Sequence, residues 1–245
     1  MEDVVVLDWT FSPPDYFEEP IHKKYDDYEM IIGDGKVQVR IDPDAYNSDP
    51  AKRHKLHDEV TRWFVGPMLI AHKPYSLSEA SICRLYRDGR RDAFIFPPAA
   101  VMVLRGLAPD IGDSRQKRID RKRQLAELSA ISDSADPVLK SILKSYDQAV
   151  KYPGNEFTHL YEVRDALTRK FGSEGAARSA LGISSRSWSQ FGRLTCKENL
   201  RQGRHRGEHI GLLRDATSEE LDEVRGFAAA LIENYMNLVR TKADS

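Results

Sequence analysis

The spacing of apolar residues changes partway along the chain, and this change constrains the fold more than any other feature. Up to about residue 110, short apolar runs are separated by glycine turns, whereas from Asp136 onward apolar residues recur every three or four positions. A period of two is typical of strands and a period of 3.6 is typical of helices. We therefore predict an α+β protein with a β-rich N-terminal module over residues 1–110, a basic connecting helix or linker over 111–135, and a helical bundle over 136–245.

Glycine turns predict two hairpins in the N-terminal module. Gly33-Asp34-Gly35 separates the apolar residues 29–32 from the alternating residues 36–41, and Asp88-Gly89 separates residues 81–86 from 92–96. Between the hairpins, apolar residues at helical spacing predict a helix over residues 50–64. These residues are Leu56, Val60 and Phe64.

Helix boundaries in the C-terminal half are predicted by residues that cap helices. Proline suits a first helical turn, glycine suits a helix end, and serine or threonine suits a helix start. Thr217 with Glu220 forms a capping box ahead of a long final helix. The other signals are Pro137, Gly172, Ser173, Gly182, and Ser184 or Ser185.

The net charge of −1 conceals an uneven distribution of charge along the 245 residues. The first 50 residues are rich in Asp and Glu, whereas arginine dominates from Arg164 to Arg206. Such a basic half can bind a phosphate backbone, or it can pair with the acidic half. A further basic run over residues 114–129 is expected to be an exposed helix, with nucleic-acid contact as the alternative. Its cations are Arg115, Lys117, Arg118, Arg121, Lys122 and Arg123.

Two properties predict where the protein resides. No apolar run is long enough to span a bilayer, so we expect no membrane partner. The two cysteines, Cys83 and Cys196, lie far apart and have no neighbouring ligand pattern, which favours reduced thiols and a cytoplasmic protein.

One segment places titratable groups at a spacing with chemical use. Arg204-His205-Arg206-Gly207-Glu208-His209 brings together a permanently charged guanidinium and two imidazoles that titrate near neutrality. An arginine, a polar neighbour and a histidine five positions after the arginine resemble the motif of the HEPN domains. Those domains are small helical bundles, and many are metal-independent ribonucleases that act as dimers in toxin and phage-defence systems.

The resemblance implies a homodimeric endoribonuclease that needs no metal or other cofactor. Arg204 would hold the scissile phosphate, His209 would act as general acid or base, and His205 would orient Arg204 or the phosphate. RNA is the expected partner, because the attacking 2′-hydroxyl lies within the substrate. Further contacts to the nucleic acid are assigned to Arg186, Arg193, Arg201 and Arg206. In the family the motif continues as helix, whereas Gly207 and the flanking glycines here favour a loop.

Residues 174–190 resemble a helix-turn-helix, which gives an alternative function as a DNA-binding regulator. Ala177 would allow the helices to cross closely, Gly182 would form the turn, and Ile183 and Trp188 would pack inside. The polar side chains left to read base edges in the major groove would be those of Ser185, Arg186, Ser187 and Gln190.

Two other interpretations concern the same arginine-histidine segment. His205 and His209, with Cys196 or Glu208, have the types of side chain that bind a metal, but two histidines are too few ligands and Gly207 disfavours a shared helix. We therefore predict no metal site. A HEPN-like bundle that binds RNA or a partner protein without cleaving RNA is the remaining alternative.

Overall fold

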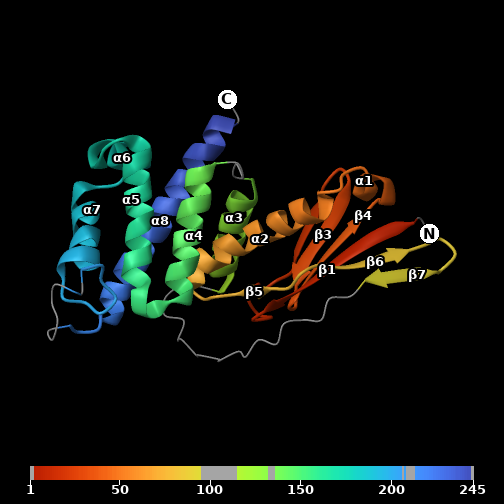
Figure 1. Ribbon diagram of the computed structural model, residues 1–245, viewed down its shortest axis with the longest axis horizontal. Coiled ribbons are helices and arrows are strands. Elements are labelled where there is room, and N and C mark those ends of the chain that lie inside the picture. The colour runs from red at the N-terminus through yellow and green to blue at the C-terminus, as the bar shows by residue number, and fades with distance from the viewer. Residues whose placement is uncertain (1–2, 95–114, 132–135, 206, 208–212, 244–245) are drawn as a thin grey trace. The chain divides into compact units, whose positions relative to one another are not determined.

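The computed structural model describes residues 3–94, 115–131, 136–205, 207 and 213–243 (Figure 1). The predicted α+β class is confirmed, since an antiparallel sheet is followed along the chain by helices. The chain divides into two compact units. The first, the sheet unit, comprises Met1–Pro67 and Tyr75–Ala130, and the second, the helical unit, comprises Met68–Pro74 and Ile131–Ser245.

The sheet unit is built on antiparallel strands in the order β2-β3-β4-β1-β6-β7, with β5 paired to β1. Both predicted hairpins form, β3–β4 and β6–β7, although residues 95 and 96 of the second predicted arm lie outside the described residues. Asp34 and Gly35 both have positive φ, of 50° and 73°, which a tight two-residue hairpin turn requires. The strands are β1 (Val4–Ser12), β2 (Ile21–Lys24), β3 (Tyr28–Gly33), β4 (Lys36–Ile41), β5 (Ser76–Leu77), β6 (Ser81–Leu85) and β7 (Arg91–Phe94).

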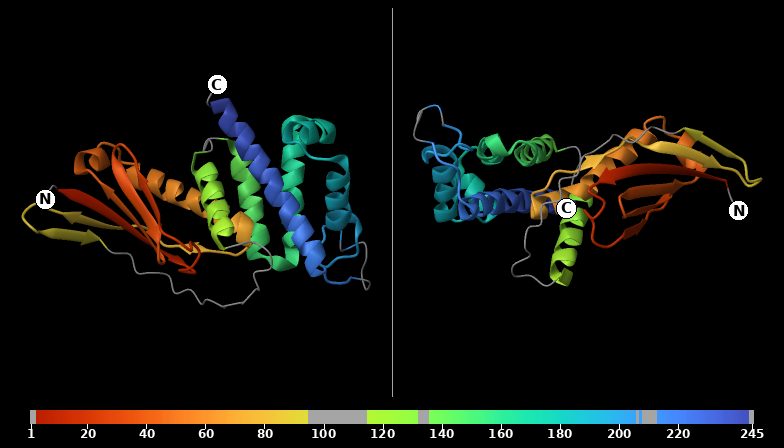
Figure 2. Two further views of the ribbon diagram at one scale, coloured as in Figure 1. Left: turned by 180° about the vertical axis from the view of Figure 1, so that it is seen from behind. Right: turned by 90° about the horizontal axis from the view of Figure 1, so that it is seen from below.

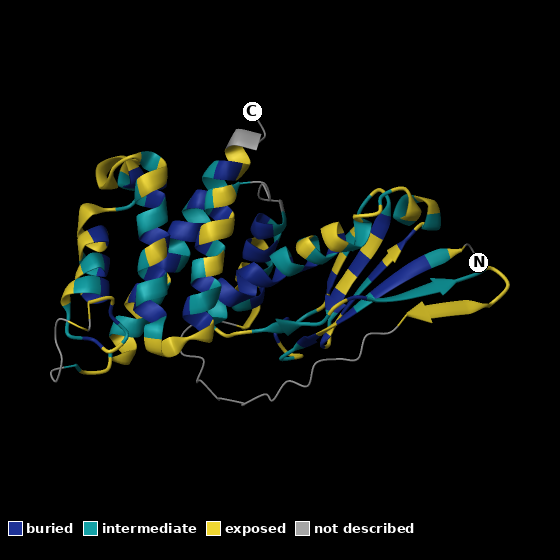
Figure 3. Cartoon of the chain, in the orientation of Figure 1, coloured by how far each residue is buried: buried dark blue, intermediate teal, exposed yellow. Residues whose placement is uncertain are grey.

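The core of the sheet unit lies between one face of the sheet and helix α2 (Lys52–Ala71). Burial alternates along β3 and β4, which Figure 3 shows as alternating colours on the strands. The ring of Phe64 on α2 packs edge-on against Phe11 at 5.1 Å between centroids. Leu56, Val60 and Phe64 are all buried, so the predicted apolar face of this helix is confirmed, although the helix continues beyond residue 64. The short α1 (Pro43–Asn47) begins at the capping side chain of Asp42.

Helix α3 (Arg115–Ile131) differs from the predicted exposed connecting helix. One of its faces is buried in the sheet unit through Ile119, Leu125, Ala126 and Leu128. Gly66 on α2 permits this packing, because a Cβ there would lie 2.3 Å from the backbone nitrogen of Ala126. Charged residues outnumber apolar residues in α3, so the sequence indicated an exposed helix, although a narrow apolar stripe packs in the core.

The helical unit is a bundle, and its helices begin and end at the predicted residues. Pro137 begins α4 as predicted. Asp136 caps α4 by accepting a hydrogen bond from the amide of Leu139 at 2.8 Å. Gly172 and Gly182 end their helices in the left-handed conformation. The capping box of Thr217 and Glu220 forms with both hydrogen bonds. The elements are α4 (Pro137–Lys151), η1 (Pro153–Asn155), α5 (Glu156–Phe171), α6 (Glu174–Leu181), α7 (Ser185–Gly192), the π-helical turn η2 (Arg193–Lys197) and α8 (Ser218–Ala243).

Helices α4, α5 and α8 form the centre of the bundle. The views in Figure 2 show α8 lying across α4 and α5, in agreement with the contacts among the three helices. Figure 3 shows dark blue, buried positions along these helices, and the side chains that face one another are buried. They include Ile142, Tyr146, Leu160, Leu231, Ile232 and Tyr235. Within the described part of the chain, no helix is both long enough and apolar enough to cross a bilayer.

Candidate functional site

The turn that carries Arg204 and His205 follows the π-helical turn η2 and is held by backbone hydrogen bonds. The amide of Arg204 donates to the carbonyl of Thr195 at 2.9 Å, and the amide of Gly203 donates to the carbonyl of Leu200 at 3.0 Å. A Cβ at residue 203 would lie 3.1 Å from the carbonyl oxygen of Leu200, so glycine suits this close turn. Residues 201–205 are therefore not helical, as the flanking glycines predicted and unlike the helical motif of the HEPN family.

The side chain of Arg204 is exposed, and its guanidinium lies over an aromatic ring. The guanidinium carbon is 4.8 Å from the centroid of Tyr161 on α5. Arg204 forms no ion pair with any residue that the structure describes, whereas neighbouring arginines are paired with carboxylates. No carboxylate of the described residues therefore compensates its positive charge. The neighbouring pairs are Arg193 with Glu198, Arg201 with Asp215, and Arg214 with Glu220.

The other predicted site residues are only partly placed. His205 is exposed beside Arg204, in the same turn. His209, Glu208 and Arg206 lie outside the described residues, so the convergence of Arg204 and His209 on one phosphate remains a prediction. In the described part of the chain, no group of three or more His, Cys, Asp or Glu side chains could hold a metal ion.

Helices α6 and α7 are two short helices joined at Gly182, within the segment whose sequence resembles a helix-turn-helix. Ser173 and Ser184 cap the two helices, and Gly182 between them has a φ of 63°. Ala177 and Trp188 are buried as predicted, whereas Ile183 is only partly buried.

The predicted base-reading side chains of α7 differ in their partners. Ser185, Arg186 and Ser187 are exposed, and Arg186 has no ion-pair partner among the described residues. Gln190 is partly engaged, because its amide donates to Glu223 at 3.4 Å. The face of α7 is therefore polar, with one available cation at Arg186.

A stack of rings and guanidinium groups beneath Arg204 was not predicted. Arg164 on α5 lies 5.4 Å from the ring centroid of Tyr161 and 4.9 Å from that of Trp188. Arg164 is buried and forms an ion pair with Glu174. In the sequence, Tyr161 is one of the residues that recur every three or four positions after Asp136, and no local signal links it to a turn more than forty positions away.

A buried polar network inside the helical unit was also missed. Glu156 is 1% exposed and accepts two hydrogen bonds from Arg225, at 2.6 and 2.9 Å. His72 Nε2 lies 3.0 Å from the same carboxylate, and its Nδ1 lies 3.1 Å from the hydroxyl of Tyr146. Burial raises the pKa of Glu156, but the hydrogen bonds from Arg225 and His72 outweigh burial and hold this pKa below its ordinary value. Since the carboxylate of Glu156 is buried and its oxygens are engaged by these partners, we assign the network to stability.

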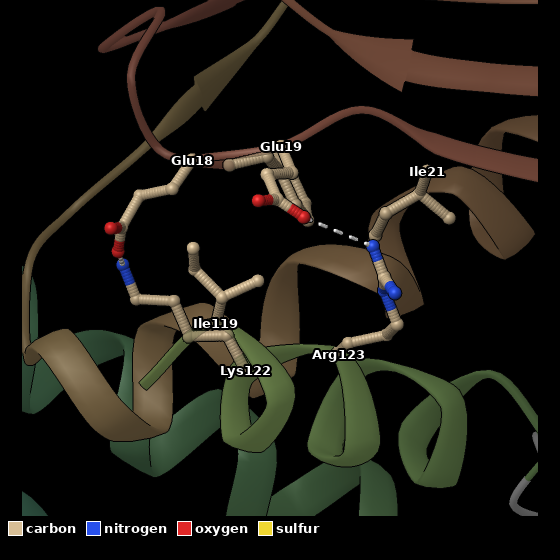
Figure 4. A pocket seen from close by; sticks show the side chains of 7 residues that line it. Glu18, Glu19, Ile21, Ile119, Lys122 and Arg123 are labelled. Carbon is tan, nitrogen blue, oxygen red and sulfur yellow. Dashed lines mark hydrogen bonds and ion pairs between the residues drawn. The ribbon is translucent and has the colours of Figure 1, made fainter. Parts of the chain in front are cut away.

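The basic face of α3 is engaged within the sheet unit by two carboxylates (Figure 4). Glu18 accepts hydrogen bonds from Arg118 at 2.9 and 2.8 Å and from Lys122 at 2.8 Å. Glu19 lies 3.7 Å from Arg123. Glu18 and Glu19 also line a cavity of only about 20 Å³, which is room for about one water molecule. This cavity is therefore too small for a substrate.

Comparisons with protein-family models, curated proteins and solved structures found no match for this chain. The fold and the site therefore define a two-unit α+β protein whose helical unit presents an exposed arginine on a tight turn, with no ion-pair partner among the described residues.

Proposed function

We propose that the helical unit is a metal-independent endoribonuclease of the HEPN kind, acting as a homodimer in the cytoplasm, of the type used in toxin and phage-defence systems. The observation that carries the proposal is Arg204, an exposed arginine that lies over Tyr161 and has no carboxylate partner among the described residues. A guanidinium so placed keeps its charge and its N–H donors for a phosphate.

The proposed reaction uses a nucleophile already present in RNA. His209 of one protomer removes the proton of the ribose 2′-hydroxyl, and the 2′-oxygen attacks the adjacent phosphorus. Arg204 stabilises the charge that grows on the non-bridging oxygens. A second histidine, supplied by the other protomer, gives a proton to the departing 5′-oxygen. One P–O bond forms and one breaks, which leaves a 2′,3′-cyclic phosphate and a 5′-hydroxyl.

The test compares cleavage of RNA by the wild-type chain and by the variants Arg204→Ala and His209→Ala, with a chelator present throughout. We expect each variant to cut at least about 100-fold more slowly. Arg169→Ala is the matched control, because Arg169 is an exposed arginine of α5 that pairs with Asp165 at 3.1 Å. The control should cut like wild type, the products should carry cyclic phosphate ends, and DNA should stay intact.

Three results would count against this proposal. Equal cleavage by His209→Ala and wild type would exclude the assigned chemistry. A monomeric chain at working concentration, measured by light scattering, would exclude the shared site. Tight binding of RNA that stays intact after long incubation would instead identify a non-catalytic RNA-binding module.

The geometry of α6 and α7 favours DNA binding as a second candidate function. The specific observation is the exposed Arg186 on a capped helix that follows a left-handed glycine. We expect such a module to bind duplex DNA with an affinity that falls steeply as salt rises, and to bind more weakly after Arg186→Ala. Duplex binding that is weak at low salt, or equal in wild type and Arg186→Ala, would exclude this candidate.

A further inference from the structure

Arg204 is the outermost member of an alternating stack of aromatic rings and guanidinium groups. Trp188 on α7 is followed by Arg164 and Tyr161 on α5, and Tyr161 is followed by Arg204 on the turn. Figure 1 shows α5 and α7 side by side at this end of the helical unit. Three elements of the bundle thus contribute to the support beneath one exposed side chain.

The inner part of the stack is fixed in place. Arg164 is buried, and its charge is compensated by Glu174. Gly192 leaves the space that Arg164 occupies, because a Cβ at residue 192 would lie 2.2 Å from its Nη1 atom. A buried and paired arginine has little freedom to move, so it limits the movement of the Tyr161 ring against which it packs.

The outer part of the stack holds Arg204 without using its donors. A ring binds a cation through its face, whereas the five N–H donors of a guanidinium lie along the edge of its plane. A carboxylate partner would take up these donors, as Glu220 does with Arg214 at 2.6 Å. Holding a long side chain ready for a ligand also reduces the entropy lost on binding. Tyr161 therefore orients the cation and leaves it able to bind.

We propose that Tyr161 is a positioning residue that holds the guanidinium of Arg204 ready to bind a phosphodiester of RNA. The identity of the ligand depends on the function proposed above, but the positioning itself does not. The hydroxyl of Tyr161 has no hydrogen-bond partner among the described residues, so the ring carries the effect. Tyr161→Phe should therefore behave like wild type, whereas Tyr161→Leu should not.

The first experiment measures positioning in the absence of RNA. Arginine Nε–Hε signals are recorded by NMR for wild type, Tyr161→Phe and Tyr161→Leu, and the Arg204 signal is assigned by its absence from Arg204→Ala. We expect the ring current to shift the Arg204 signal in wild type and in Tyr161→Phe. In Tyr161→Leu the signal should remain but lose this shift. An Arg204 signal at the same position in wild type and Tyr161→Leu would overturn the proposal.

The second experiment measures the affinity for a single-stranded oligouridylate of Tyr161→Leu, Arg204→Ala and the double variant. Loss of an exposed cation–π contact should weaken binding about three- to five-fold in Tyr161→Leu. In the double variant, Tyr161→Leu should add nothing to Arg204→Ala, because its effect acts through Arg204. If the affinity losses of the two single variants multiply in the double variant, Tyr161 acts independently of Arg204, and the proposal is overturned.

Tyr152→Leu is the matched control, since Tyr152 is 55% exposed in the same unit and makes no ring contact with Arg204. It should bind the oligonucleotide like wild type. Equal weakening by Tyr152→Leu and Tyr161→Leu would remove the specific role of Tyr161. Failure of the wild-type chain to bind or cut RNA would overturn the proposed function and the RNA ligand, while the NMR signal would still decide whether Tyr161 positions Arg204.

Discussion

The carboxylate of Glu156 is the most deeply buried charged group among the described residues of the helical unit. It is 1% exposed, and it is satisfied by two hydrogen bonds from Arg225 and by His72. Removing one partner of a buried ion pair leaves the other charge uncompensated, at a cost of about 3–5 kcal/mol. The side chain of Arg225 is 29% exposed and water can reach part of it, so the low end of this range applies. We expect Glu156→Gln to lower the free energy of unfolding of the helical unit by about 3 kcal/mol.

Hydrogen exchange followed by mass spectrometry is the suitable assay, because it reports on each unit separately. In a chain of two units, a single unfolding midpoint does not define one free energy. A loss of about 3 kcal/mol corresponds to exchange about 100-fold faster in the most protected peptides of α4, α5 and α8. Peptides from the sheet strands should exchange at the wild-type rate.

The same variant makes a prediction about pH. The pKa of Glu156 in the folded chain lies below its ordinary value of 4.5. The stabilisation is therefore complete above pH 4.5 and is lost as the pH falls through the lower, folded-state pKa. The difference in the free energy of unfolding between wild type and Glu156→Gln should be largest at neutral pH and should shrink below pH 4.5.

The control is Asp165→Asn, which breaks the exposed pair of Asp165 with Arg169 on α5. An exposed pair one helical turn apart contributes about 0.5 kcal/mol or less, so exchange should hardly change. If Glu156→Gln cost no more than this control, the inference that the buried carboxylate stabilises the bundle would be refuted.

Three further variants test the packing and the electrostatics. Gly66→Ala should cost at least about 2 kcal/mol in the sheet unit, seen as faster exchange there, because the new Cβ would meet the backbone of Ala126 at 2.3 Å. Glu18→Gln should lower the free energy of unfolding of the sheet unit by about 3 kcal/mol at neutral pH. The reason is that hydrogen bonds from cations of α3 lower the pKa of Glu18 from 4.5 to about 2. Denaturation at pH 2 should show a much smaller loss of stability, because Glu18 is then largely protonated in the unfolded chain. Gly192→Ala should displace Arg164 at a cost of about 1–3 kcal/mol and should alter the NMR signal of Arg204; an unchanged signal would argue against a connected stack.

Features encoded by neighbouring residues were predictable. The hairpin turn at Gly33–Gly35, the helix ends at Gly172 and Gly182, and the capping box of Thr217 depend on hydrogen bonds between residues at most a few positions apart. Such patterns are visible in any short window of sequence. Helix α3 shows where this reasoning fails, because its basic run indicated a solvated helix, whereas Gly66, far away in sequence, allows the close packing that buries one face.

Residue spacing and capping signals predicted the α+β class, both hairpins and several helix boundaries, and singled out Arg204. Which charges are compensated became evident only from the folded arrangement of the chain. The cations of α3 meet Glu18, and Arg225 meets Glu156, while among the described residues Arg204 meets the ring of Tyr161 and no carboxylate. The physical reason is that turns and caps depend on separation along the chain, whereas the interaction between charges depends on distance in space.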